Sequence, residues 1–257
     1  MGGADVRFSF RGVMHSTGVL YLASSPAERR HMETMLIGAA YCAYAAFWIR
    51  FFTHSLMWWR AAQRLRGPDD SRSTLRACAL TVMDAVLLFR VLNANPALWI
   101  GEWAFHTSFL LVVLRHMRYV LDPVPLWVWR LQTPGLIGGY ILPFALAYVL
   151  LIRLLTKHEK YTAPANMFLI TLVLLISSIG VVMHAWYKPD LVAVKLFTLG
   201  ALSFHPAPPP EGLLFLTHFT LALVLIPFLP THIFTAPLVM MEARKREQAL
   251  HLVMHDE

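Results

Sequence analysis

Long runs of apolar residues dominate this chain, and short polar segments separate them. A helix needs about 20 apolar residues to cross the ~30 Å hydrocarbon layer of a bilayer. Five runs reach that length and predict membrane-spanning helices at about residues 34–57, 98–119, 136–155, 165–187 and 212–236. We see no internal repeat. The pattern therefore predicts an all-α integral membrane protein, a bundle of five transmembrane helices forming one membrane domain over residues 34–236.

The stretch between the first two runs is too long for a simple turn. Within it, residues 74–93 (TLRACALTVMDAVLLFRVLN) carry apolar side chains at helical spacing, interrupted by Arg76, Asp84 and Arg90. This spacing is typical of an amphipathic helix that lies on the membrane surface or against a partner subunit. A sixth spanning helix is the alternative, and Asp84 near its centre argues against it.

The composition excludes an ordinary soluble domain. Of the 257 residues, 57% are hydrophobic and 14% are charged, whereas a soluble protein has about a quarter of its residues charged. The first ten residues are polar and do not resemble a signal peptide, so the first apolar run is expected to remain as a membrane helix.

The net charge of +7 is explained by membrane topology. The positive residues lie between the apolar runs and form no interleaved basic and aromatic patch, which argues against a nucleic-acid partner. Twelve Lys and Arg residues fall on one side of the predicted bundle and nine on the other. The positive-inside rule then places residues 1–33 outside the cytoplasm and residues 237–257 in a cytoplasmic tail.

Four histidines lie inside predicted spans, His106 and His116 in the second and His218 and His232 in the fifth. An imidazole in hydrocarbon is costly unless it faces a partner in the bundle interior. The second and fifth spans run antiparallel, which pairs His116 with His218 towards the outside and His106 with His232 towards the cytoplasm. Along the helix axis, His106 and His116 are about 15 Å apart, and His218 and His232 are about 21 Å apart. These separations are compatible with two stacked sites.

Paired imidazoles on facing helices predict axial ligation of b-type haem. A single membrane histidine more often forms a helix–helix hydrogen bond. Zinc or copper is a weaker alternative, because no HExxH motif or cysteine-containing metal set is present. The two cysteines, Cys42 and Cys78, cannot supply the four thiolates of an iron–sulfur cluster, so any such cluster belongs to a partner.

Several segments resemble the membrane cytochrome b of the sulfite-reductase-associated electron transport complex (the DsrM type), which is related to the gamma subunit of respiratory nitrate reductase. The likeness is carried by FHTSFLLVVLRHMRYV (105–120), LDPVP (121–125), LVAVKLFTLGALSFHP (191–206) and PEGLLFLTHFTLALVLIPFLP (210–230).

The resemblance implies a five-helix fold, b-type haem, and electron exchange with the quinone pool in the cytoplasmic membrane of a prokaryote. It also implies a cytoplasmic iron–sulfur partner of the heterodisulfide-reductase type and a role in sulfur or sulfite metabolism. By position, His106, His116 and His218 match the family's ligands, whereas the fourth falls on Ala236. His232, one turn earlier, either substitutes as the fourth ligand or leaves a single haem.

Polar residues near the predicted span ends are candidates for binding a quinone or the haem propionates. Those towards the outer end are Arg118, His184, Lys195 and His205, and those towards the inner end are Arg50 and His54. The alternative is that these residues mark the membrane interface or cap helices.

The leading function is an electron-transfer subunit that links quinones to a cytoplasmic iron–sulfur module. A cytochrome b subunit of another respiratory reductase, such as nitrate reductase, is the alternative within the same class. A proton channel or transporter with a histidine relay belongs to a different class, and it would more usually show carboxylates within the spans and repeated halves. A purely structural anchor subunit is the remaining option.

Overall fold

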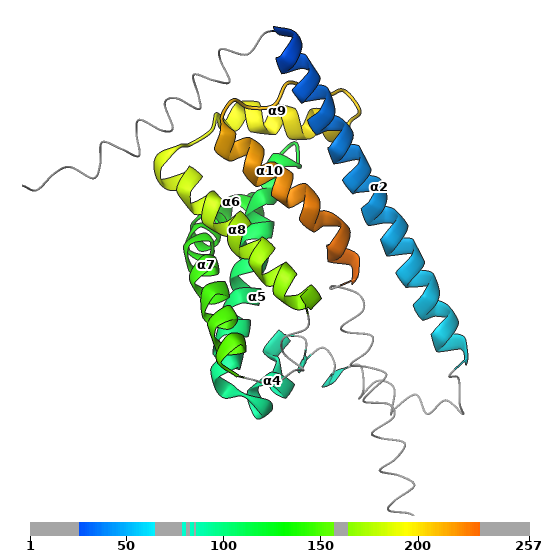
Figure 1. The fold of residues 1–257 in the computed structure, drawn as a ribbon, viewed down its shortest axis with the longest axis vertical. Coiled ribbons are helices and arrows are strands. Elements are labelled where there is room, and N and C mark those ends of the chain that lie inside the picture. Colours follow the sequence, from blue (N-terminus) through cyan, green and yellow to red (C-terminus); the bar gives the residue numbers. More distant parts are fainter. Residues whose placement is uncertain (1–25, 65–78, 81–82, 85, 157–163, 232–257) are drawn as a thin grey trace, which may run out of the picture. The chain divides into compact units, whose positions relative to one another are not determined.

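The computed structural model describes residues 26–64, 79–80, 83–84, 86–156 and 164–231, and the regular structure in those ranges is entirely helical (Figure 1). Residues 1–25 of the predicted extracytoplasmic segment 1–33, the predicted cytoplasmic tail 237–257 and the candidate ligand His232 lie outside the described residues. The all-α prediction is confirmed for the described part of the chain.

Among the described residues, four helices are long and apolar enough to cross a membrane. They are α2 (Pro26–Arg64), α5 (Pro96–His116, continued by the 3-10 turn η1, Met117–Tyr119), α7 (Gln132–Leu155) and α8 (Pro164–Trp186). Their candidate spans are Glu33–Arg60, Pro96–Tyr119, Gln132–Leu155 and Pro164–Trp186. These agree with the first four predicted spans, and the chain is a multi-pass membrane protein.

The last apolar run forms the shorter helix α10 (Leu213–Leu225), followed by the 3-10 turn η3 (Ile226–Phe228). Pro227 lacks an amide N–H, and its ring interferes with the preceding turn, so the α-helix is interrupted there by a 3-10 turn, while residues 229–231 remain helical. The described part of this run is shorter than the predicted span 212–236, and residues 232–236 lie outside it. A fifth span, and the five-helix count, therefore remain predictions.

The predicted amphipathic helix at 74–93 is described only in part. Its described end is interrupted at Leu88, whose backbone is left-handed (φ 51°), and the short helix α4 (Phe89–Ala94) begins immediately after it. The prediction of one continuous helix through this region is therefore wrong at Leu88. Asn95 then turns the chain into α5, because its side chain accepts a hydrogen bond of 3.0 Å from the amide of Leu98.

In the part of the chain that the structure describes, two further helices occur that the hydrophobic pattern did not predict. They are α6 (Leu126–Arg130) and α9 (Leu191–Leu202). Asp190 caps the start of α9, since its carboxylate accepts a 2.9 Å hydrogen bond from the amide of Val192. With twelve residues, α9 is too short to cross a bilayer.

The helices pack into two compact units, and α2, α5, α7 and α8 each contribute to both. The first unit consists of the described parts of residues 1–42, 108–143 and 172–223. The second consists of the described parts of residues 43–107, 144–171 and 224–257. Each unit carries one part of the candidate site, so the two are described separately.

In the first unit, the core forms where α9 meets α10. Phe197 of α9 is 1% exposed, and its ring lies 5.1 Å from that of Phe219 and 6.1 Å from that of Phe215. Burying such aromatic rings stabilises the contact by a few kcal/mol. This packing fixes the rotation of α10 and therefore the direction of His218.

In the second unit, the core forms where α5 crosses α7. A Cβ atom on Gly101 would lie 2.6 Å from the ring of Tyr148 and 2.7 Å from Val149, so only glycine allows this approach. Leu146 and Val149 are almost completely buried beside it. The tight crossing brings polar residues of α5 and α7 close together.

Candidate functional site

The first unit brings together one of the two predicted histidine pairs. His116 is the last residue of α5, and His218 lies in the middle of α10. The two imidazoles are close enough for a charge on one to act on the other. The structure therefore brings into one compact unit two residues that are 102 positions apart in the sequence.

Both rings are oriented through one nitrogen and leave the other available. Nδ1 of His116 donates to the carbonyl oxygen of Val112 at 2.7 Å, and Nδ1 of His218 donates to that of Ile176 at 3.0 Å. A carbonyl can only accept, so Nδ1 must carry the proton and Nε2 keeps its lone pair. Neither Nε2 has a hydrogen-bond partner among the described residues. A histidine that binds a metal is usually held in this way.

Gly180 of α8 allows the ring of His218 to lie against the helix backbone. A Cβ atom at this position would lie 3.2 Å from Cε1 and 3.7 Å from Nδ1 of His218. The ring is therefore bounded on one side by Gly180 and held by the carbonyl oxygen of Ile176. Its orientation is set by packing as well as by a hydrogen bond.

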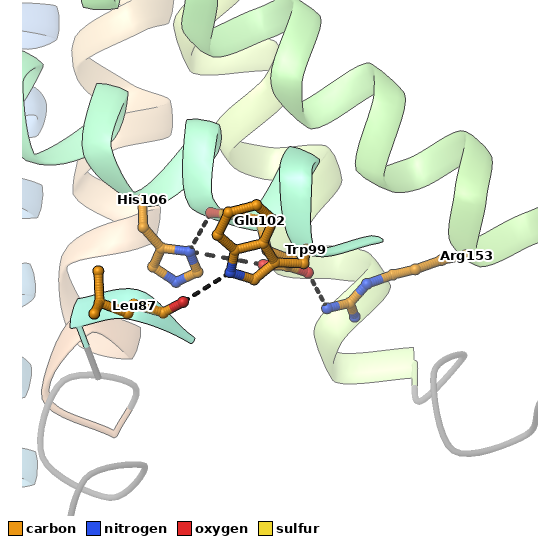
Figure 2. A network of polar contacts seen from close by, with 5 residues as sticks. All are labelled: Leu87, Trp99, Glu102, His106 and Arg153. Carbon is orange, nitrogen blue, oxygen red and sulfur yellow. Dashed lines mark hydrogen bonds and ion pairs between the residues drawn. The ribbon is translucent and has the colours of Figure 1, made fainter. Parts of the chain in front are cut away.

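The second unit holds His106 within a network of polar contacts (Figure 2). Nδ1 of His106 lies 2.7 Å from the carbonyl oxygen of Glu102 and 3.7 Å from that residue's Oε2. Arg153 of α7 forms an ion pair of 2.5 Å with Oε1 of Glu102. The side chains of Glu102 and Arg153 are only 9% and 15% exposed.

This ion pair was not predicted from the sequence. Nothing in the spacing links two residues on different helices. The predicted partner of His106, His232, lies outside the described residues, so the structure does not test that pair.

The four outer candidates for a quinone or propionate site each have a separate partner. Arg118 donates to Oε1 of Gln132 at 3.2 Å and to the hydroxyl of Tyr119, over whose ring it lies. The ring of Tyr119 is 5.9 Å from that of His116, so Arg118 is connected to the histidine pair through Tyr119.

The other three outer candidates have partners of different kinds. Lys195 forms a 2.8 Å ion pair with Asp122, and His205 donates from Nδ1 to the carbonyl oxygen of Ser203 in its own turn. His184 is hydrogen-bonded through Nδ1 to the hydroxyl of Tyr140 at 3.1 Å. Of these three, only His184 pairs with a group that can both donate and accept a hydrogen bond.

The inner candidates, Arg50 and His54, attach α2 to the end of the last apolar run. Arg50 donates to the carbonyl oxygen of Pro227 at 3.2 Å, and its guanidinium lies 5.3 Å from the centre of the Phe228 ring. Nε2 of His54 lies 3.1 Å from the hydroxyl of Thr231. This nitrogen is therefore occupied, in contrast to Nε2 of His116 and His218.

Comparison with known proteins finds two curated relatives. The Hdr-like menaquinol oxidoreductase cytochrome b-like subunit of Archaeoglobus profundus is 32% identical, over 63% of this chain and 57% of the relative. The protein of the same description from Archaeoglobus fulgidus is 32% identical, over 52% of this chain and 45% of the relative. The chain thus spans about half the length of the curated relatives it matches. No family model and no solved structure matches the chain.

These relatives support one part of the resemblance noted from the sequence. Both are described as cytochrome b-like subunits of a menaquinol oxidoreductase, and neither is described as the DsrM type. The similarity is therefore to cytochrome b-like subunits of a menaquinol oxidoreductase, and not to the DsrM type specifically.

Proposed function

We propose that this chain is a b-type cytochrome subunit that exchanges electrons with the membrane quinone pool. The observation that carries the proposal is the pair His116 and His218, which come from distant segments and leave both Nε2 atoms available. The descriptions of the two relatives support the same class of protein.

The residues of the first unit fit an axially ligated haem. His116 and His218 would hold the iron through Nε2, while the carbonyl oxygens of Val112 and Ile176 fix the two rings. Haem with two imidazole ligands supplies reversible one-electron transfer. The protein's contribution is to fix both rings before the group binds, with Gly180 providing the space beside His218.

A second haem between His106 and His232 is the further part of the proposal. His106 is supported by its contact with Glu102 and, through it, Arg153. Its ring is fixed through Nδ1 in the same way as that of His116.

The finer identity is also a proposal. We place the chain beside the DsrM type, with residues 1–33 outside the cytoplasm, residues 237–257 in the cytoplasm, and a cytoplasmic iron–sulfur partner of the heterodisulfide-reductase type. The sequence motifs support the likeness to the DsrM type, and the distribution of Lys and Arg supports the location of the two ends. The shortage of cysteines in this chain supports the iron–sulfur partner.

The test is the haem content and spectrum of the purified chain. We expect a dithionite-reduced spectrum typical of haem with two imidazole ligands, and loss of about one haem per chain in His116→Ala and in His218→Ala, because an axial ligand is removed. His31→Ala is the matched control, since His31 is exposed on α2.

Two outcomes would contradict the proposal. Wild-type protein without haem would refute it, and so would unchanged haem content in both variants of the first pair. His106→Ala and His232→Ala then count the sites. If either variant lowers the haem content, the chain binds a second haem in addition to the one held by His116 and His218. If neither variant changes the haem content, the chain binds one haem.

A further inference from the structure

Tyr140 and His184 form a hydrogen-bonded pair between two spanning helices of the first unit. The Tyr140 hydroxyl lies 3.1 Å from Nδ1 of His184, and the two rings meet edge to face at 5.9 Å. Tyr140 lies on α7 and His184 in the last turn of α8. Nε2 of His184 has no hydrogen-bond partner among the described residues.

This pair is reachable from outside the helix bundle. Tyr140 is 39% exposed, and Ile137 and Ile141, three residues before it and one after it, are 54% and 44% exposed. Residues three and four positions apart share a helix face, so an apolar surface of α7 surrounds the phenol. A polar pair next to an exposed apolar surface suits a ligand with a polar head and an apolar tail.

We infer that the Tyr140–His184 pair binds the ring oxygen of a quinone and of its quinol. The inference rests on the proposed function, which supplies the class of ligand, and adds the atoms that recognise it. In this arrangement Nε2 of His184 contacts the ring oxygen, and the tail lies against the apolar face of α7.

The pair is suited to this ligand because its hydrogen bonds can reverse. When Tyr140 donates to Nδ1, the imidazole carries its proton on Nε2 and donates to a quinone carbonyl. When Nδ1 donates to the Tyr140 oxygen, Nε2 accepts from a quinol hydroxyl. The two ligand states therefore bind to the same pair without any net gain or loss of a proton by the protein.

The surrounding charges favour the same ligand. Arg115, Arg118 and Lys188 lie close enough to act on the charge of His184. A positive environment attracts the partially negative oxygens of a quinone ring.

The pair also lies in the unit that contains His116 and His218. Arg118, one of the surrounding cations, is connected to His116 through Tyr119. A quinone bound to this unit is therefore held by the same packed segments as the proposed haem site, as an electron donor or acceptor of that site requires.

The inference is tested by binding of the quinol analogue 2-heptyl-4-hydroxyquinoline N-oxide to the purified haem-loaded protein in lipid nanodiscs, followed by the quenching of its fluorescence. We expect Tyr140→Phe and His184→Gln each to raise the dissociation constant about five- to tenfold, since each removes one hydrogen bond of the relay. The double variant should be no weaker than the worse single one.

Tyr148→Phe is the matched control. Tyr148 lies on the same helix, is 37% exposed, and donates a hydrogen bond of the same 3.1 Å to the carbonyl oxygen of Ala97. Its removal should leave analogue binding unchanged. Equal dissociation constants for wild type, Tyr140→Phe and His184→Gln would overturn the inference and show that the pair only joins α7 to α8.

The haem spectrum of the same samples separates the two proposals. Wild-type protein without haem refutes the proposed function itself. Haem at the wild-type level in all variants, with unchanged analogue binding, refutes only the assignment of the quinone to Tyr140 and His184. Weakened binding with an intact haem spectrum supports both.

Discussion

The buried ion pair between Glu102 and Arg153 gives the sharpest prediction for stability. Both side chains are largely removed from solvent, at 9% and 15% exposed, and the charged atoms are 2.5 Å apart. Arg153→Gln leaves the Glu102 carboxylate buried, with His106 Nδ1 at 3.7 Å. Removing one partner of a buried pair typically costs about 3–5 kcal/mol, so we expect the free energy of unfolding to fall by about 3 kcal/mol or more.

The double variant Glu102→Gln with Arg153→Gln should recover most of that loss. It leaves no buried charge unpaired, so its cost should be about 1 kcal/mol. The assay is unfolding in mixed detergent micelles, followed by circular dichroism. A double-mutant cycle should then give a coupling energy of roughly 2–4 kcal/mol.

The Lys195–Asp122 pair is the internal control for this cycle. Its 2.8 Å contact is similar in length, but its side chains are 30% and 66% exposed. Lys195→Gln should cost less than about 1 kcal/mol, because solvent screens an exposed pair. If the double variant lost the sum of the two single losses, the coupling inferred from the buried geometry would be refuted.

Two smaller predictions concern the packing of His218 and the attachment of α2. Gly180→Val should lower haem content, measured by the pyridine haemochrome, because even a Cβ would approach the His218 ring to 3.2 Å, whereas Gly38→Ala should not, since nothing lies within 4 Å of its Cβ. His54→Ala should lower the free energy of unfolding by about 1 kcal/mol through loss of its 3.1 Å contact with Thr231. Thr231→Val should give a similar loss, and a full additive loss in the pair would show that the two do not interact.

The four long spans could be predicted because hydrophobicity measures the free-energy cost of moving a side chain from lipid to water. That cost determines which residues lie in the membrane. The predicted starts at 98 and 165 lie within two residues of Pro96 and Pro164, where the structure begins α5 and α8. A proline is well suited to the first turn of a helix. The pattern did not predict that α2 continues from Pro26 to Arg64, because a helix can extend into water after its apolar part ends.

The shorter elements were less predictable. α9 has an apolar sequence but too few residues for a span, and its start depends on the side-chain cap from Asp190. The break at Leu88 requires a left-handed backbone at a leucine, for which the sequence gives no warning. Neither feature follows from hydrophobic spacing, because the first depends on a local side-chain cap and the second on a backbone conformation.

Some residues of the candidate site could also be predicted from the sequence, and others could not. His116 and His218 could be proposed as partners because membrane histidines are rare, costly and visible in the sequence. Tyr140 could not, since a tyrosine in a membrane helix is ordinary, and its meaning comes from lying 3.1 Å from His184 on another helix. Side-chain pairs across helices become visible only when the rotation of each helix is known.

The first spanning helix has a consequence for how the protein matures in the bilayer. Only 6% of its apolar window is buried, against 22%, 33% and 22% for α5, α7 and α8. Once inserted, such a helix gains little from further exclusion of water, and its lateral association depends on specific contacts such as those of Arg50 and His54. α2 therefore has the properties of a self-sufficient insertion unit, since the rest of the described chain covers little of its apolar surface, and a change in lipid composition should loosen it before the other spans.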